Sequence, residues 1–205
     1  MRKVVLLFFT LFFVLVTNAS AAWDEGIEYR VINPPVPTQT GSKIEVVELF
    51  WYGCPHCFRL EPRIKQWKKN KPANVEFVRV PAIFNKRWEL HAKAFYTAEV
   101  LGVLDKIHTP LFDEIHVRKK HLNNKSKLKA FFVKHGVKAE DFDNTFDSFM
   151  VNIKVNRARD LSKRYGIDGV PSLVVNGKYL TDGPMASGHE NLMKILDFLI
   201  KKEGK

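Results

Sequence analysis

The sequence predicts an α/β fold into which an all-helical segment is inserted, and two patterns support this prediction. Between residues 44 and 80, a strand pattern, a helix pattern and a second strand pattern follow one another, as in a parallel βαβ unit. From about residue 85 to residue 165 the chain shows one helix pattern after another, and strand patterns then return. The 205 residues, of which 45% are hydrophobic, provide enough apolar side chain for a core, which excludes a disordered chain.

Residues 1–21 have the three parts of a secretory signal peptide. Arg2 and Lys3 form a positive start, Val4–Val16 is an apolar run, and Ala19–Ala21 is a small-residue cleavage pattern. The apolar run is much shorter than the roughly 20 residues that a membrane-spanning helix needs. We therefore expect residues 1–21 to be removed during export.

The chain is basic, with 33 Lys and Arg against 22 Asp and Glu and a formal net charge of +11. Such an excess can indicate binding to nucleic acid, contact with an anionic membrane, or a contribution to solubility. Many of the basic residues lie between Arg118 and Lys138, where they are spread along helix patterns. Together with the expected export, this spacing favours a solvated basic face, and we expect no nucleic-acid partner.

The first part of the chain after residue 21 contains the βαβ unit. An edge strand is expected at Ile27–Ile32, before a Pro- and Thr-rich loop at residues 34–42. Ile44–Tyr52 is nearly continuous in apolar and aromatic residues, which predicts a strand buried on both faces. A helix pattern then extends to about Asn70, and Val75–Val80 alternates like a second strand.

Several residues in the helical segment have the types that begin or end helices. Thr109 and Pro110 are expected to form the N-cap and the first residue of one helix. Ser126 is expected to cap the next helix, which ends at Gly136. These signals predict separate helices rather than one long one.

An aromatic repeat and a long helix pattern complete the helical segment. Phe142, Phe146 and Phe149 recur at spacings of four and three residues, which predicts one apolar stripe on a helix. A long helix is then expected from Val151 to Gly166, where glycine is placed for a left-handed C-terminal cap.

Strand patterns return after the helical segment. Ser172–Val175 is apolar, Asn176–Gly177 is a strong hairpin turn, and Lys178–Leu180 leads back along a second strand. A final amphipathic helix is expected at about residues 189–201. The sequence thus predicts an α/β domain at residues 22–84 and 159–205, and an inserted helical domain at residues 85–158.

The chemistry is expected to depend on Cys54 and Cys57, because the chain has only 2 cysteines. A zinc site needs four ligands, and the histidines show no paired ligand spacing, so we expect no metal. A structural disulfide across such a short loop would contribute only about 2 kcal/mol to stability. The third interpretation is a redox-active pair.

The position of Cys54, at the end of a predicted strand and the start of a predicted helix, favours redox chemistry. There its sulfur would face unpaired backbone N–H groups and the positive end of the helix dipole, both of which stabilise a thiolate. Pro55 suits the first helical turn because it has no N–H to leave unpaired. His56 would add a partly cationic donor near the sulfur, and Cys57 would serve as the resolving thiol.

Three segments carry a resemblance to a known family. Residues 48–57 (ELFWYGCPHC), 169–171 (GVP) and 175–179 (VNGKY) are together similar to the DsbA family of bacterial periplasmic thiol:disulfide oxidoreductases. The resemblance covers essentially the whole chain after residue 21, and Cys-Pro-His-Cys is fairly specific among thioredoxin-like proteins. It implies a thioredoxin-like domain with an inserted all-helical domain, in a protein located in the periplasm.

The resemblance also implies roles for single residues. Cys54 would be the solvent-facing nucleophile, and Cys57 would be its buried partner. Pro171 would follow a cis peptide bond opposite the active site, and Val170 before it would help to hold a substrate strand.

The resemblance further places a charged pair beneath the cysteines. Glu48 falls where the family keeps an acidic residue, which would tune the thiolate. Arg79 departs from the family pattern, because the best-known members carry a lysine there. The positive charge is kept, and the geometry of its pairing with Glu48 is left open.

The thiolate argument gives the direction of the reaction. A Cys54 pKa of about 4 would stabilise the reduced form by about 4 kcal/mol at pH 7, and would make the pair roughly 90 mV more oxidising. We therefore expect a monomeric disulfide donor that oxidises newly exported proteins through a mixed disulfide at Cys54, without a cofactor. The resemblance implies re-oxidation by a quinone-linked membrane partner of the DsbB type.

Two other functions stay open at this stage. A disulfide isomerase or reductase would use the same cysteines, but isomerases of the family usually carry a separate dimerisation domain, which we do not expect in this chain. A peptide-binding holdase would use the groove beside Pro171, and its cysteines would be incidental. Thiol-oxidation and insulin-reduction assays on the wild type and on Cys54→Ala distinguish the three.

Overall fold

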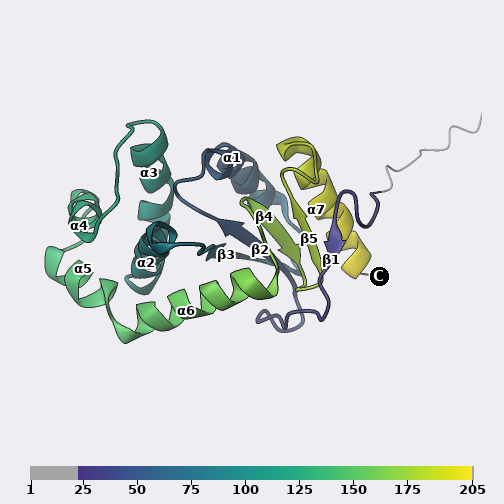
Figure 1. The fold of residues 1–205 in the computed structure, drawn as a ribbon, viewed down its shortest axis with the longest axis horizontal. Coiled ribbons are helices and arrows are strands. Elements are labelled where there is room, and N and C mark those ends of the chain that lie inside the picture. Colours follow the sequence, from purple (N-terminus) through teal and green to yellow (C-terminus); the bar gives the residue numbers. More distant parts are fainter. Residues whose placement is uncertain (1–22, 205) are drawn as a thin grey trace, which may run out of the picture.

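The centre of the fold is a five-stranded mixed sheet with the strand order β1-β5-β4-β2-β3 (Figure 1). The structure is a computed structural model that describes residues 23–204, so the signal peptide expected at residues 1–21 lies outside the described residues. β2 and β3 are parallel, whereas the other neighbouring strands are antiparallel. The strands are β1 (Arg30–Val31), β2 (Ile44–Phe50), β3 (Val75–Pro81), β4 (Ser172–Val175) and β5 (Tyr179–Asp182).

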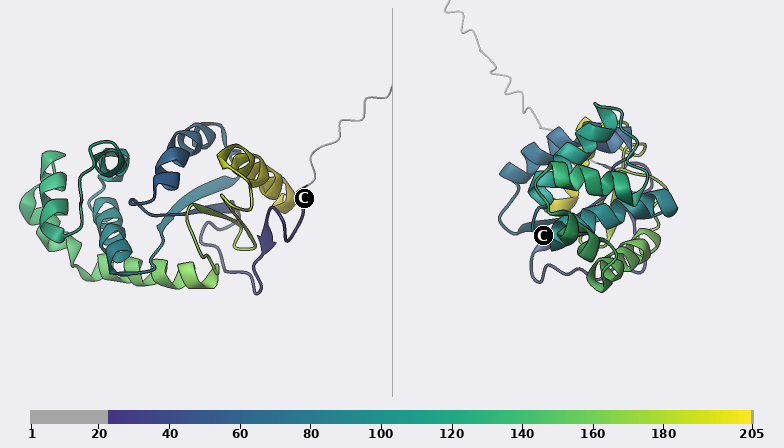
Figure 2. Two further views of the ribbon diagram at one scale, coloured as in Figure 1. Left: turned by 45° about the horizontal axis from the view of Figure 1, so that its top comes forward. Right: turned by 90° about the vertical axis from the view of Figure 1, so that its left-hand side faces the viewer.

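Helices cover both faces of this sheet and extend beyond one end of it. Figures 1 and 2 show α1 and α7 on one face, α6 along the other face, and α3, α4 and α5 beyond the sheet. The α/β class with inserted helices is therefore confirmed. The helices are α1 (Pro55–Asn70), α2 (Lys86–Val100), α3 (Leu104–His116), α4 (Lys125–Lys134), α5 (Ala139–Phe146), α6 (Phe149–Arg164) and α7 (His189–Glu203).

The expected strands are present, with ends set by local turns. All seven residues of β2 are buried, as the apolar run predicts. β2 stops at Phe50 rather than Tyr52, because the chain turns and the Cys54 N–H donates to the Trp51 carbonyl oxygen at 2.9 Å. The N-terminal edge strand is restricted to Arg30–Val31, which pair with β5.

The hairpin between β4 and β5 forms at the predicted turn. Asn176 (φ 52°) and Gly177 (φ 64°) both adopt the left-handed conformation that such turns require. A Cβ at Gly177 would lie 1.8 Å from the Val36 carbonyl oxygen. Glycine is therefore needed here for its backbone conformation and for the close approach of the chain around Val36.

The expected start of α3 at Thr109 and Pro110 is wrong, because the helix begins at Leu104 and Pro110 lies inside it. Ile107 and His108, which precede the predicted start, are both buried. The packing of this first turn outweighs the hydrogen bond that proline cannot donate.

Two further predictions in the helical segment are wrong. The N-cap of α4 is Asn124, whose side chain accepts from the Lys127 N–H at 2.9 Å, and not Ser126; asparagine caps helices as well as serine does. Phe149 does not extend the stripe of Phe142 and Phe146. It begins a new helix after the Ser148 cap, and it is 77% exposed.

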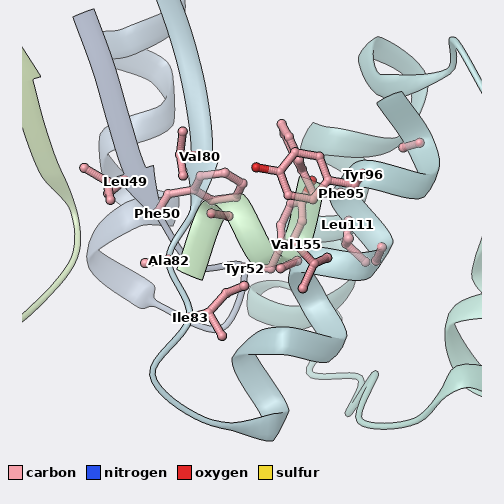
Figure 3. Close-up of a cluster of buried hydrophobic side chains, with 14 of the residues drawn as sticks. Leu49, Phe50, Tyr52, Val80, Ala82, Ile83, Phe95, Tyr96, Leu111 and Val155 are labelled. Atoms are coloured by element: carbon pink, nitrogen blue, oxygen red, sulfur yellow. The ribbon is translucent and has the colours of Figure 1, made fainter. Parts of the chain in front are cut away.

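The end of the sheet and the inserted helices share one core. Figure 3 shows Phe50 and Val80 of the sheet beside Phe95 and Tyr96 of α2, and the Phe50 and Phe95 rings lie 5.5 Å apart. α6 (Phe149–Arg164) is one continuous helix, and it therefore extends across the domain boundary expected at residue 158. Within the described range, residues 23–204, the helices are too short or too polar to cross a lipid bilayer.

Candidate active site

Cys54 lies where β2, the turn at residues 51–53 and α1 meet. It is the N-cap of α1, with an extended backbone (φ −86°, ψ 117°). The helix begins at Pro55, whose missing N–H would have no partner at this position. The turn therefore places the Cys54 sulfur at the unpaired N–H groups of the helix start.

Hydrogen bonds to its sulfur lower the pKa of Cys54. The Cys57 backbone N–H donates to Cys54 Sγ at an N–S distance of 3.4 Å. The pKa falls from 9.0 to about 6, mainly through the hydrogen bond with the Cys57 thiol, against the effect of burial. The backbone N–H groups of Cys57 and His56 and the charge of Arg59 lower it further. Most of this thiol is thus ionised at neutral pH.

Cys57 has the opposite environment. Cys57 is 0% exposed, and Cys54, the cysteine expected to face solvent, is itself only 7% exposed and also buried. Burial raises the pKa of Cys57 well above 9.0, and its hydrogen bond to Cys54 and the charges of Cys54 and Glu48 raise it further. At neutral pH the pair therefore consists of one thiolate and one thiol, in which Cys54 can attack and leave.

The pKa of about 6 reduces the driving force that a pKa of 4 would supply. At pH 7 the Cys54 thiolate stabilises the reduced form by at most about 1.4 kcal/mol relative to an ordinary thiol. This corresponds to roughly 30 mV. The thiolate thus stabilises the reduced form by about a third of the expected free energy. The sign of this contribution still favours transfer of the disulfide to a substrate.

His56 contacts the sulfur and its own helix through different atoms. Its backbone N–H lowers the pKa of Cys54. Its imidazole Nδ1 instead accepts from Arg59 Nη2 at 3.0 Å on the exposed side of α1.

Val170 and Pro171 lie beside Cys54, although they are far away in sequence. Cys54 Sγ lies 3.3 Å from the Val170 carbonyl oxygen, to which it donates when the thiol is protonated. The peptide bond between Val170 and Pro171 is cis. The carbonyl before the proline is therefore in direct contact with the reactive sulfur.

Glu48 lies beneath the cysteines and pairs with Arg79. Arg79 Nε donates to Glu48 Oε2 at 2.9 Å, and the two residues also sit opposite each other in β3 and β2. Glu48 is fully buried, and its Oε1 has no partner among the described residues. Burial raises the pKa of Glu48 to about 7, although the Arg79 charge opposes this rise.

A polar network that the sequence analysis missed continues from Arg79. Arg79 Nη2 donates to both carboxylate oxygens of Glu61 at 2.9 Å. His108 Nε2 lies 3.1 Å from Glu61 Oε1, and His108 Nδ1 lies 2.9 Å from the Tyr52 hydroxyl. Burial lowers the pKa of His108, so the neutral ring donates to Glu61 and accepts from Tyr52.

The position of one member of this network, Glu61, could have been predicted from the sequence. Glu61 follows Cys57 by four residues, so both side chains lie on the same face of α1. That of His108 could not, because α3 brings it to Glu61 across 47 residues. His116, at the other end of α3, also reaches the site, and its Nε2 lies 2.8 Å from the Tyr52 carbonyl oxygen.

The active-site turn, residues 51–53, packs against two stacked tryptophan rings. The Trp51 and Trp88 rings are parallel, with centroids 4.5 Å apart. Arg87 lies over the Trp51 ring, 5.5 Å from its centroid. A Cβ at Gly53 would lie 2.2 Å from the Trp51 ring, which its neighbours hold in place.

Replacing Gly53 with alanine is expected to lower the free energy of unfolding by about 1–3 kcal/mol, because the added methyl group overpacks the turn against Trp51. Urea unfolding measures this change. Gly183→Ala is the matched control, since its Cβ would meet nothing within 4 Å and its effect should stay within about 0.5 kcal/mol. Equal midpoints for the two variants would contradict the role of Gly53.

Comparison with known proteins identifies the family. Residues 77–199 match the family model of the DSBA-like thioredoxin domain. The thiol:disulfide interchange protein DsbA of Pseudomonas syringae pv. tomato is 40% identical over 191 residues, which are 93% of this chain and 89% of that protein. The chain belongs to the DsbA family. The DsbA of Azotobacter vinelandii is 41% identical to it over 99% of this chain and 98% of that protein.

Solved structures agree with this assignment. The crystal structure of Pseudomonas aeruginosa DsbA has a TM-score of 0.83 and 43% identity, and the match covers 87% of this chain and 93% of that one. The Xylella fastidiosa DsbA structure has a TM-score of 0.81 and 32% identity, over 86% and 95% of the two chains. This DsbA-family protein is a thiol:disulfide oxidoreductase with a thioredoxin-like fold, and Cys54 and Cys57 form its cysteine pair.

Proposed function

We propose that this DsbA-family protein donates its Cys54–Cys57 disulfide to reduced or unfolded exported proteins in the periplasm. The observation that carries the proposal is the position of Cys54 Sγ at the start of α1, where it accepts from the Cys57 N–H at 3.4 Å and has a pKa of about 6. In the disulfide, Cys54 Sγ carries no negative charge, so these hydrogen bonds stabilise it less than they stabilise the thiolate. Reduction of the pair is thus favoured.

The reaction proceeds in two exchanges. A substrate thiolate attacks Cys54 Sγ of the disulfide, and Cys57 leaves as a thiolate that takes up a proton because of its raised pKa. A second substrate thiolate then attacks the substrate sulfur of the mixed disulfide and releases Cys54 as a thiolate. The substrate loses two electrons as its disulfide forms, and the two cysteines of the protein gain them.

The substrate would bind beside the cis-proline segment. The Val170 carbonyl already contacts Cys54, so a strand paired with this segment would bring its cysteine to the sulfur. Proteus mirabilis DsbA, 26% identical with a TM-score of 0.72, has been solved with a non-covalently bound peptide that contains cysteine.

Pro55, His56 and Glu48 are the residues proposed to tune the Cys54 thiolate. A quinone-linked membrane partner of the DsbB type would re-oxidise the monomer.

Two cysteine variants test the proposal. With a reduced unfolded protein as substrate, wild type should form substrate disulfides stoichiometrically, and Cys54→Ala should form none. When the substrate protein is supplied in its oxidised form, Cys57→Ala should accumulate a mixed disulfide, because the Cys54 thiolate attacks the substrate disulfide and no Cys57 thiol is present to resolve the adduct. Electrophoresis without reductant detects this adduct.

The alternative functions give other results. If the protein is a holdase, Cys54→Ala should suppress aggregation as well as the wild type does. If it is a reductase, the wild type should reduce insulin faster than it oxidises thiols. With the oxidised substrate, a mixed disulfide that forms on Cys57 in Cys54→Ala as fast as the one on Cys54 in Cys57→Ala would also overturn the proposed roles.

A further inference from the structure

A basic pocket lies directly beside the active-site turn. Its volume is about 300 Å³, and its lining includes Gly53 and Pro55, the two neighbours of Cys54 in sequence. Three permanent cations line the same pocket, namely Arg87, Lys119 and Lys120. Among the described residues that line it there is no carboxylate. We refer to it as the basic pocket.

The cations of the basic pocket are available for a ligand. Arg87, Lys119 and Lys120 are exposed, and within residues 23–204 none of them forms an ion pair. Arg87 is held over the Trp51 ring, so its charge is fixed near the turn. His91 also lines the pocket, and burial lowers its pKa to about 4, so it is neutral and adds no charge.

The positive surface continues away from Cys54. A second pocket of about 410 Å³ shares Lys119 and Lys120 with the first and adds Lys127 and Lys134. The carboxylate in its lining, Glu114, is paired with Arg118 and lies 3.9 Å from Lys134 Nζ, so Lys119, Lys120 and Lys127 are the cations of this pocket without an ion pair among the described residues. A row of cations therefore begins at the active-site turn and extends along α4, which suits an extended chain with several negative charges better than a single small anion.

We infer that the basic pocket binds acidic side chains next to the reacting cysteine of a substrate polypeptide, so that acidic thiol segments are preferred substrates. Negative neighbours raise the pKa of a substrate thiol and so make it less reactive. Binding of those neighbours to the cations offsets this repulsion at the moment of exchange. The inference rests on the proposed disulfide-donor function, and it adds the class of substrate.

The test uses three peptides that differ only in the residues around two cysteines: acidic, neutral or basic. The kcat/KM for their oxidation is measured for wild type and for Lys119→Glu/Lys120→Glu. The ratio of variant to wild type is taken for each peptide, which removes differences in peptide reactivity. We expect a loss of about tenfold for the acidic peptide, a change within about twofold for the neutral one, and a gain for the basic one. About 0.5 M salt should largely remove the difference.

The matched control is Lys106→Glu/Lys138→Glu, which changes the net charge equally. Both residues are exposed and neither lines the basic pocket. The control should change every rate by less than about twofold. An equal loss of kcat/KM for the acidic peptide in both double variants would assign the effect to net charge and overturn the inference. The absence of a loss in both variants would also overturn it.

The remaining outcomes distinguish a substrate site from a membrane-binding site, and the inference from the proposed function. If wild type fails to oxidise the neutral peptide, the proposed function itself is wrong. If the neutral peptide is oxidised and the acidic peptide loses nothing in Lys119→Glu/Lys120→Glu, only the inference fails. Unchanged acidic-peptide rates with lost binding to anionic phospholipid vesicles would assign the pocket to a membrane surface instead.

Discussion

Replacing Arg79 with methionine is expected to lower the free energy of unfolding by about 3–5 kcal/mol at neutral pH, because a broken buried ion pair leaves an uncompensated charge. Arg79 is the cation between two carboxylates, and it donates to Glu48 and to Glu61 at 2.9 Å each. Glu48 has 0% side-chain exposure and Glu61 has 13%. Urea unfolding of the reduced proteins measures the loss.

The pH dependence of this loss identifies its cause. Without Arg79, the pKa of Glu48 in the folded state rises further above that in the unfolded state, so the unfolded chain binds fewer protons. The stability of the variant then falls as the pH rises from about 5 to about 8, whereas that of the wild type stops falling near its Glu48 pKa of about 7. The penalty of Arg79→Met therefore grows mainly above pH 7. Arg79→Lys is the conservative control, and it should lose less than half as much. A penalty that is equal at all pH values would indicate lost packing rather than an unpaired charge.

The parts of the fold that follow from neighbouring residues could be predicted. The seven buried residues of β2, the left-handed turn at Asn176 and Gly177, and the helix start after Cys54 all depend on side chains within a few positions. The redox pair was predictable for the same reason. Its determinants, the Cys57 thiol and the N-cap position of Cys54, lie within three residues of each other.

The parts that depend on distant contacts could not be predicted. His108 looks like a surface or core histidine in sequence, but α3 carries it to Glu61 and Tyr52. The same packing pulls the start of α3 back to Leu104, against the local signal of Pro110. The basic pocket is also assembled from separate segments, since Arg87 lies in the first turn of α2 and Lys119 follows α3. Only the fold brings them to the turn.

The stability of the reduced protein relative to the oxidised one is expected to increase as the pH rises from about 5 to about 8. The Cys54 pKa is about 6 in the folded protein, and that of an unfolded cysteine is about 8.5. A lowered folded pKa contributes stability that is present at high pH and is lost as the pH falls through the folded value. The contribution is near zero at pH 5, at most about 1.4 kcal/mol at pH 7, and at most about 2.6 kcal/mol at pH 8.

The difference between the two redox forms isolates this thiolate. Closure of the disulfide loop favours the oxidised form by about 2 kcal/mol, but that contribution does not depend on pH. Cys57, with its raised pKa, destabilises the reduced form only above about pH 8.5, where unfolded cysteine ionises. Groups common to both forms largely cancel. Urea unfolding of both forms at several pH values measures the difference. Cys54→Ser, which forms no disulfide, should lack the rise in stability with pH that the reduced wild type shows relative to the oxidised protein. A difference that stays constant from about pH 5 to about pH 8 would show that the folded protein does not stabilise the Cys54 thiolate, and the direction proposed for disulfide transfer would then lack its physical basis.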